Sequence, residues 1–212
     1  MNENNKMTQE IEIKLDLGSF TNYLKLIGFL GHIEDEIKQI NAFFDSNNRK
    51  LANAGWALRV RAENRRGLVT IKSIATNKSI ATIRQEVETQ INRQDAIALI
   101  NLQADVMELP AMPVEYLRQE VGKIKVERLV QFENIRQRKL FKINDQNYML
   151  EIDKTEFNDG SVEYELELEL SDTSKIETIE ANLRKLFLTL DIPFIRQTES
   201  KFARALKKAD IL

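Results

Sequence analysis

The sequence has no cysteine and only one histidine, His32, among its 212 residues. Disulfides, thiolate chemistry and histidine-rich metal sites are therefore excluded, and so is any Ser–His–Asp arrangement that does not use His32. His32 follows Gly31 where a helix is expected to end, which indicates a solvated turn residue. Only three prolines and seven glycines are present, which argues against long flexible linkers.

Long apolar runs are absent as well, since no stretch reaches the roughly 18 apolar residues of a membrane-spanning helix. Residues 1–9 are polar and lack the apolar segment of a signal peptide. We therefore expect a cytoplasmic protein that does not bind membranes, with residues 1–6 as a mobile tail. The 31 basic and 33 acidic residues give a net charge of −2, which predicts no general attraction to nucleic acid. The length fits one domain over residues 1–212, as a monomer or a homodimer.

What the sequence does contain is a set of short segments in which charged and apolar residues alternate. In the first, Glu10, Glu12 and Lys14 alternate with Ile11 and Ile13. This period of two is typical of a strand and puts the three charged side chains on one face. Same-face positions lie roughly 6.5–7 Å apart, so the carboxylates can share divalent cations and the lysine can reach an anion that the metal holds. The alternative for this segment alone is an ordinary half-buried strand with a solvated charged face.

Similar patterns along the chain predict an α+β protein. Besides a first strand over residues 7–17, strands are expected at 36–45, 56–63, 68–73, 82–91, 125–133, 135–138, 140–143, 148–154 and 162–170. Helices are expected at 20–29, 95–102, 114–121, 174–190 and from residue 200 onward. Most strands follow one another through short turns, so they must be largely antiparallel.

The charges on these strands are sorted by sign. The acidic faces carry Glu10, Glu12, Glu165, Glu167 and Glu169, and the basic faces carry Arg59, Arg61, Lys72, Arg136 and Arg138. Carboxylates aligned on one strand repel one another unless cations lie opposite. A sheet closed into a barrel with these faces inward pairs the charges and forms a polar tunnel, and amphipathic helices then cover its apolar outside. A surface salt bridge is the alternative for any single basic pair.

A tunnel of this kind suits a polyphosphate bound with a metal ion. Arginine and lysine bind phosphoryl oxygens, and carboxylates hold Mg²⁺ or Mn²⁺ that bridges to the phosphates. The chemistry that such a site favours is phosphoryl transfer by positioning and charge neutralisation. The sequence contains no Gly-rich Walker loop, so a P-loop enzyme is excluded.

An ordered series of motifs spans nearly the whole chain. The motifs are Glu10-x-Glu12-x-Lys14, Phe44-Asp45, Leu58-Arg59-Val60-Arg61, Thr70-Ile71-Lys72, Arg84-x-Glu86-x-Glu88, Phe132 to Arg136, Leu150 to Asp153, Tyr164 to Glu169 and Ser200-Lys201-Phe202. In this order they resemble the CYTH superfamily, the triphosphate tunnel metalloenzymes. The resemblance implies a closed eight-stranded antiparallel tunnel with helices packed outside, which binds a small-molecule triphosphate with Mg²⁺ or Mn²⁺.

The resemblance also implies roles for individual residues. The expected metal ligands are Glu10, Glu12, Asp153, Glu167 and Glu169, with Glu86, Glu88 and Glu165 as second choices. The expected phosphate ligands are Lys14, Arg59, Arg61, Lys72, Arg136 and Lys201, with Arg138 as a second choice for Arg136. Lys201 is expected to orient or activate water, and it forms the catalytic set together with Glu12. Which two of the three late glutamates bind metal stays open.

The family contains several activities, and the sequence contains no separate aromatic platform for thiamine or adenine. Trp56, the only tryptophan, is expected on the outer face. We therefore expect hydrolysis of inorganic tripolyphosphate to pyrophosphate and phosphate. The alternatives are thiamine triphosphatase, nucleoside triphosphatase or class IV adenylate cyclase on the same fold, and a non-catalytic polyphosphate-binding module.

Overall fold

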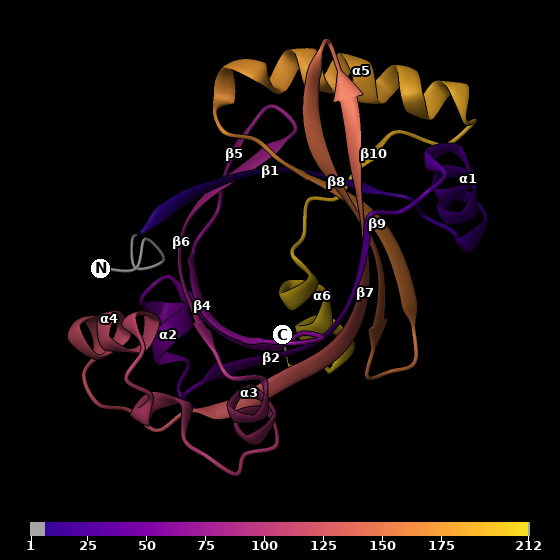
Figure 1. Cartoon of the computed structure of the whole chain (residues 1–212). Coiled ribbons are helices and arrows are strands. Elements are labelled where there is room, and N and C mark those ends of the chain that lie inside the picture. The colour runs from indigo at the N-terminus through magenta and orange to yellow at the C-terminus, as the bar shows by residue number, and fades with distance from the viewer. Residues whose placement is uncertain (1–6, 212) are drawn as a thin grey trace.

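The computed structural model describes residues 7–211; residues 1–6, expected as a mobile tail, and residue 212 lie outside the described part (Figure 1). Eight strands form the barrel: β1 (Thr8–Asp16), β2 (Asp35–Asp45), β3 (Trp56–Ala62), β4 (Gly67–Ser73), β6 (Ala81–Ile91), β7 (Glu127–Ile143), β8 (Gln146–Phe157) and β9 (Val162–Glu169). Two short strands, β5 (Thr76–Lys78) and β10 (Ile195–Arg196), pair with β6 and β1. The helices are α1 (Phe20–Leu30), α2 (Lys50–Asn53), α3 (Arg93–Ile100), α4 (Met112–Val121), α5 (Ile176–Thr189) and α6 (Lys201–Lys208).

The barrel is antiparallel and closed, as expected from the sequence. Its strand order is β1-β9-β8-β7-β2-β3-β4-β6, and pairing of β1 with β6 completes the ring seen end-on in Figure 1. In a ring of this order, β3 lies four strands from β9 in either direction. Side chains that point inward from β3 and β9 therefore face each other across the interior.

Alternation along each strand separates an apolar outside from a polar inside. On β1, Ile11, Ile13 and Leu15 are buried in a core that α1 and α5 cover from outside. A second core joins α2, α3 and α4 to the outer faces of β2, β3, β4 and β6. Burial of this apolar surface is the main stabilising contribution to the barrel, and it leaves the charged residues of the same strands facing inward.

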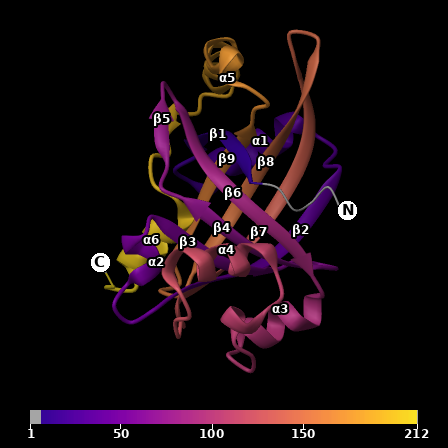
Figure 2. The same cartoon turned by 90° about the vertical axis from the view of Figure 1, so that its left-hand side faces the viewer.

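The helix α6 lies at one end of the barrel (Figure 2) and is held there by aromatic packing. Phe202 stacks on Phe43 with ring centroids 4.2 Å apart and an interplanar angle of 8°. The two rings belong to a third hydrophobic cluster, which also contains Phe132, Phe157 and Leu206. Ser200 caps the helix by accepting a hydrogen bond from the Ala203 amide at 3.1 Å, so Lys201 stands in the first turn.

Several expected elements differ from the structure. The segments 125–133, 135–138 and 140–143 form one long strand, β7, because the polar residues that suggested breaks face the barrel interior; Asn134, for example, is buried. Residues 50–53 form the short helix α2 between the strands predicted at 36–45 and 56–63. The strands β5 and β10 are too short to leave a pattern in the sequence. Within residues 7–211, no helix combines the length and the apolar character needed to cross a bilayer.

Candidate active site

The barrel encloses a cavity of about 540 Å³, which side chains from all eight barrel strands and from α6 line. The expected site residues on this lining are Glu10, Glu12, Lys14, Arg59, Arg61, Lys72, Glu86, Glu88, Arg136, Arg138, Glu167, Glu169 and Lys201. The remaining two, Asp153 and Glu165, are buried behind it. The fold therefore gathers residues that lie up to about 190 positions apart in sequence into one volume of the size that binds small molecules.

One side of the cavity, here called the basic wall, consists of Arg59 and Arg61 on β3. Arg61 donates to the Asn41 Oδ1 atom at 2.7 Å, and its nearest carboxylate, that of Glu63, lies 3.7 Å away. The buried Nε of Arg59 has no hydrogen-bond partner among the described residues. Burial, together with the charges of Arg59 and Arg136, lowers the pKa of Arg61 to about 10. The positive charge of the basic wall is therefore only partly compensated by the surrounding residues.

The opposite side, here called the acidic wall, consists of Glu12, Glu167 and Glu169. Glu12 on β1 stands directly beside Glu169 on β9. Glu12 and Glu167 have cationic partners, whereas Glu169 forms no ion pair with any residue of the described range 7–211. Desolvation inside the barrel and the charges of Glu151, Glu10 and Glu12 raise the pKa of Glu169 to about 7. This carboxylate lacks a counter-cation.

The two glutamates of the N-terminal motif are paired with cations from β4 and β6. Lys72 contacts both oxygens of Glu10, at 2.9 and 3.2 Å, and also lies 2.7 Å from Glu86. Arg84 donates to Glu10 and, at 2.8 Å, to the Glu12 Oε1 atom. Sequence reasoning gave Arg84 no role, although alternation over 82–91 placed it on the same face as Glu86.

The other residues of this region pair in a similar way. Lys14 lies 3.2 Å from the Glu12 carboxylate, and Glu88 accepts from the Thr70 hydroxyl at 2.9 Å and lies 3.4 Å from Arg59. Lys14, expected to bind phosphate, thus has a carboxylate partner in the structure. Lys14 nevertheless belongs to the lining of the cavity.

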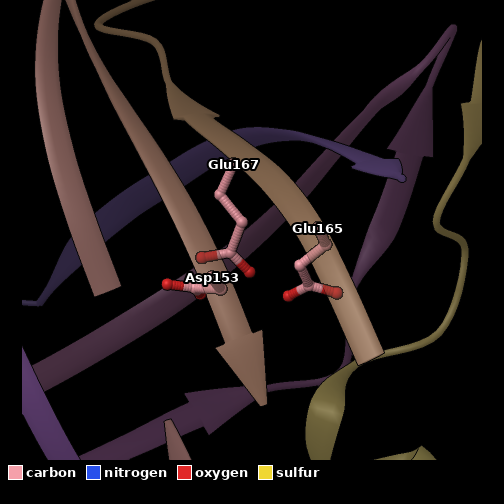
Figure 3. Close-up of side chains that lie close together, drawn as sticks. All are labelled: Asp153, Glu165 and Glu167. Carbon is pink, nitrogen blue, oxygen red and sulfur yellow. The ribbon is translucent and has the colours of Figure 1, made fainter. Parts of the chain in front are cut away.

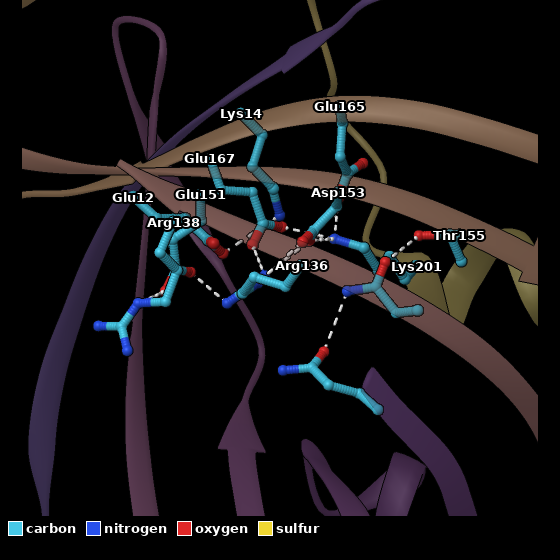
Figure 4. Close-up of polar contacts among 12 residues, drawn as sticks. Glu12, Lys14, Arg136, Arg138, Glu151, Asp153, Thr155, Glu165, Glu167 and Lys201 are labelled. Carbon is cyan, nitrogen blue, oxygen red and sulfur yellow. Dashed lines mark hydrogen bonds and ion pairs between the residues drawn. The ribbon is translucent and has the colours of Figure 1, made fainter. Parts of the chain in front are cut away.

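Three carboxylates converge where α6 meets the barrel: Asp153, Glu165 and Glu167 (Figure 3). One oxygen of each lies within 4.8 Å of the others, which is close enough to share a metal ion. In the structure they share the Lys201 ammonium, which lies 2.8 Å from Asp153 and from Glu167 and also contacts Glu165 (Figure 4). Burial lowers the pKa of Lys201 to about 7, and the charge of Asp153 opposes this shift. The pKa of Lys201 therefore lies close to neutral pH.

Arg136 stands among the same carboxylates. It donates to both oxygens of Asp153, at 2.8 and 2.6 Å, and also contacts Glu151 and Glu167 (Figure 4). Arg138 is more open, with its Nε 3.5 Å from a Glu151 oxygen. Arg136 and Arg138 therefore both line the cavity, but Arg136 already has a full set of anionic partners and Arg138 does not.

A second arginine that sequence reasoning missed, Arg204, lies one turn after Lys201 on α6. Its Nη2 donates to Glu165 at 2.6 Å and its Nε lies 2.7 Å from Glu163. Lys208, one further turn along, lies 3.0 Å from Glu163. The early glutamates of β9 thus pair with α6, and the later two, Glu167 and Glu169, face the cavity. Spacing of three and seven residues from Lys201 was the available sequence signal.

The oxygen donors around Glu169 fit a divalent ion such as Mg²⁺ or Mn²⁺, which carboxylates bind readily. Glu169 lacks a cationic partner within the described residues, and the acidic wall supplies two further carboxylates beside it. Asp153 and Glu165 fit such an ion less well, because they lie behind the cavity lining and because Lys201, Arg136 and Arg204 already contact their oxygens. The donor set thus favours the acidic wall for a metal.

The chain matches the model of the CYTH domain over residues 8–206. None of the curated proteins matches the chain at a significant level. Among solved structures, the candidate adenylyl cyclase HpAC1 from Hippeastrum, stated to have a dominant triphosphatase activity, is similar with 25% identity and a TM-score of 0.84. The match covers 93% of this chain and 95% of HpAC1.

Two more distant structures share the fold alone. A candidate adenylate cyclase from Bacillus halodurans has 20% identity and a TM-score of 0.67, over 92% of this chain and 97% of its own. The PH1819 protein of Pyrococcus horikoshii has 15% identity and a TM-score of 0.61, over 93% and 99%. Together with the closed barrel, its inward charges and the domain match over nearly the whole chain, these findings show that the chain belongs to the CYTH domain family.

Proposed function

We propose that this chain is a divalent-metal-dependent triphosphatase that hydrolyses inorganic tripolyphosphate to pyrophosphate and phosphate. The observation that supports it most is the opposition of the basic wall on β3 and the acidic wall on β1 and β9 across one cavity. Arg61 has only one ion pair, a long one of 3.7 Å to Glu63, and Glu169 has no ion pair among residues 7–211. A polyanion that carries a divalent ion supplies both partners at once.

The same opposition suggests which residues do what. We assign Mg²⁺ or Mn²⁺ binding to Glu10, Glu12, Glu167 and Glu169, and phosphate binding to Lys14, Arg59, Arg61, Lys72 and Arg138. A divalent ion held by these carboxylates would neutralise charge on the triphosphate. Arg59 and Arg61 hold the phosphoryl oxygens from the other side of the cavity. This contact orients the triphosphate for attack on a terminal phosphorus.

Lys201 is proposed as the residue that handles the attacking water. Its ammonium lies at the α6 end of the cavity, and its lowered pKa allows it to exchange a proton near neutral pH. Asp153 was expected to bind metal, and its pairing with Lys201 and Arg136 supports a positioning role for it. Arg136, with three carboxylate partners, is assigned to the same positioning role.

An inorganic substrate is favoured by the aromatic residues of the cavity. Phe43 and Phe132 are buried, and Phe202 stacks on Phe43. Phe43 stacks with both Phe202 and Phe132, so other rings rather than a nucleobase or a thiazolium ring occupy its neighbourhood. The remaining lining is mainly charged, which suits a ligand made of phosphates alone.

The experiment that tests this function is a substrate panel with Mg²⁺ and with Mn²⁺ between pH 7 and 9. Tripolyphosphate, thiamine triphosphate and ATP are supplied separately, and phosphate, pyrophosphate and cyclic AMP are quantified. Faster release of phosphate from tripolyphosphate than from the other two supports the proposal. Cyclic AMP from ATP decides for the cyclase alternative, to which the naming of HpAC1 gives some support. Tight tripolyphosphate binding in calorimetry without any hydrolysis decides for a binding module.

A further inference from the structure

Arg84 connects two carboxylates that the proposed function assigns to metal. It lies on β6 directly opposite Glu10 of β1 in the strand register. Its Nε donates to the Glu10 Oε2 atom, and its Nη2 donates to the Glu12 Oε1 atom at 2.8 Å. The side chains of all three residues are at most 14% exposed. One guanidinium therefore bridges both glutamates inside the cavity.

This bridge satisfies carboxylates that burial alone would disfavour. Burial raises the pKa of Glu10, but the charges of Lys72 and Arg84 and their hydrogen bonds outweigh it and hold the pKa below its usual value. Removing one member of a buried, hydrogen-bonded charge set leaves the others without compensation. Arg84 therefore serves as a counter-ion to Glu10 and Glu12.

The same oxygen atoms cannot bind a guanidinium and a divalent ion in the same way at once. Carboxylate oxygens bind Mg²⁺ at roughly 2.0–2.1 Å, which is inside hydrogen-bond distance. A metal ion that binds Glu10 Oε2 or Glu12 Oε1, the two oxygens that accept from Arg84, must therefore replace contacts of Arg84, and its affinity is reduced by the free energy of those contacts. Arg61, on the far strand β3, makes no such contact because its partners are Asn41 and Glu63.

We propose that Arg84 is an exchangeable counter-ion of the Glu10–Glu12 pair, a positioning residue that yields these carboxylates to the divalent ion and is then free to bind the phosphates. The inference rests on the proposed function. Its consequence is cooperativity. A metal ion that binds alone must displace Arg84 without giving its guanidinium a new partner. A metal ion that binds with triphosphate brings phosphate oxygens as that partner. Each ligand therefore strengthens the binding of the other. The alternative is that Arg84 only holds Glu10 and Glu12 in place for the metal.

The two readings predict opposite effects of one substitution. Mn²⁺ binding is measured by calorimetry and by electron paramagnetic resonance, with wild type, Arg84→Gln and Arg61→Gln as the charge-matched control. The exchange role predicts that Arg84→Gln binds Mn²⁺ alone about tenfold more tightly than wild type, while Arg61→Gln changes this affinity much less. A non-hydrolysable imido analogue of tripolyphosphate then tightens Mn²⁺ binding in wild type and much less in Arg84→Gln. Equal or weaker Mn²⁺ binding by Arg84→Gln, or binding by neither protein, overturns the proposal.

A second variant and a second readout keep the test decisive. Arg84→Lys retains a charge that can reach only one carboxylate, so its Mn²⁺ affinity is expected to lie between those of wild type and Arg84→Gln. If the glutamine variant does not fold, Arg84→Lys is compared with wild type in its place. In EDTA, Arg84→Gln is expected to melt below wild type, and Mn²⁺ is expected to raise its midpoint more. An equal rise in both proteins contradicts the exchange. Wild-type hydrolysis is assayed separately, so a protein without triphosphatase activity overturns the proposed function and leaves the Mn²⁺ comparison valid.

Discussion

The Lys201 ammonium lies 2.8 Å from the Asp153 Oδ2 atom, and Asp153 is fully buried. The same carboxylate accepts two hydrogen bonds from Arg136. A buried aspartate with two cationic partners cannot move without leaving charges unpaired. The position of Lys201 at the α6 end of the cavity is therefore determined by β7 and β8 rather than by α6 alone.

The role proposed for Glu169 is tested by Glu169→Ala. The variant removes the carboxylate that has no cationic partner among residues 7–211, so turnover with Mg²⁺ or Mn²⁺ is expected to fall by about a hundredfold or more, as for loss of a group that holds a reacting charge. The measurement is phosphate release from tripolyphosphate. Glu156→Ala, on an exposed position of β8, is the matched control and should leave the rate unchanged. Near-wild-type turnover of Glu169→Ala shows that the metal lies elsewhere.

The basic wall is tested by Arg61→Gln. The nearest carboxylate to Arg61, that of Glu63, lies 3.7 Å away, so the loss of Arg61 is expected to appear in substrate binding, with a KM raised roughly 10- to 100-fold, as expected for a hydrogen bond between charged groups. Arg65→Gln at the exposed β3–β4 turn is the control for net charge. If both variants raise the KM equally, the effect comes from general electrostatics and not from the wall.

Arg204 is expected to act through Lys201, because Glu165 contacts both side chains. Arg204→Gln should lower kcat more than it changes KM. The same substitution in a Lys201→Ala background should have no further effect, because residues that act through one another are not additive. Lys207→Gln, on the exposed side of α6, is the control. Additive losses in the double variant mean that Arg204 stabilises the helix and does not position Lys201.

Metal binding is expected to depend on pH through Glu167 and Glu169. Burial raises the pKa of Glu167 to about 7, and desolvation raises that of Glu169 to about 7 as well. Below this pH both are protonated and must lose a proton to bind metal, so Mn²⁺ affinity should rise by up to about tenfold per pH unit for each proton released. Titration calorimetry between pH 5.5 and 8 measures the slope, which Glu169→Gln should reduce. An affinity independent of pH excludes these glutamates as ligands.

The attachment of α6 depends on the stacked pair of Phe43 and Phe202. Phe43 is buried, so Phe43→Ala is expected to destabilise the protein by about 3–5 kcal/mol. Chemical denaturation measures this change. Phe20→Ala is a suitable comparison because Phe20 is 53% exposed, and it should change stability little. If Phe43→Ala lowers stability no more than Phe20→Ala does, the stacked pair contributes less to stability than its packing indicates.

The closed antiparallel barrel was predicted from the sorted charges and the family resemblance, and many of the charged residues on its inner face were predicted because alternation is a local property of a strand. Glu10, Glu12 and Lys14 share a face whatever strand lies beside them. The segment that became β7 was divided into three because polar residues such as Asn134 usually mark loops, whereas a polar barrel interior accepts them within a strand. The short strands β5 and β10 exist only through their pairing with β6 and β1.

What the tertiary structure decided is which charges are compensated. By sequence, Glu165, Glu167 and Glu169 are equivalent members of one strand face, but α6 supplies Arg204 to Glu165 and Lys201 to both Glu165 and Glu167, and no cation reaches Glu169 within the described chain. Likewise, only the β1–β6 pairing places Arg84 between Glu10 and Glu12. The face of a side chain follows from its own strand, whereas its partners follow from the order in which the ring closes, and that order joins residues far apart in sequence.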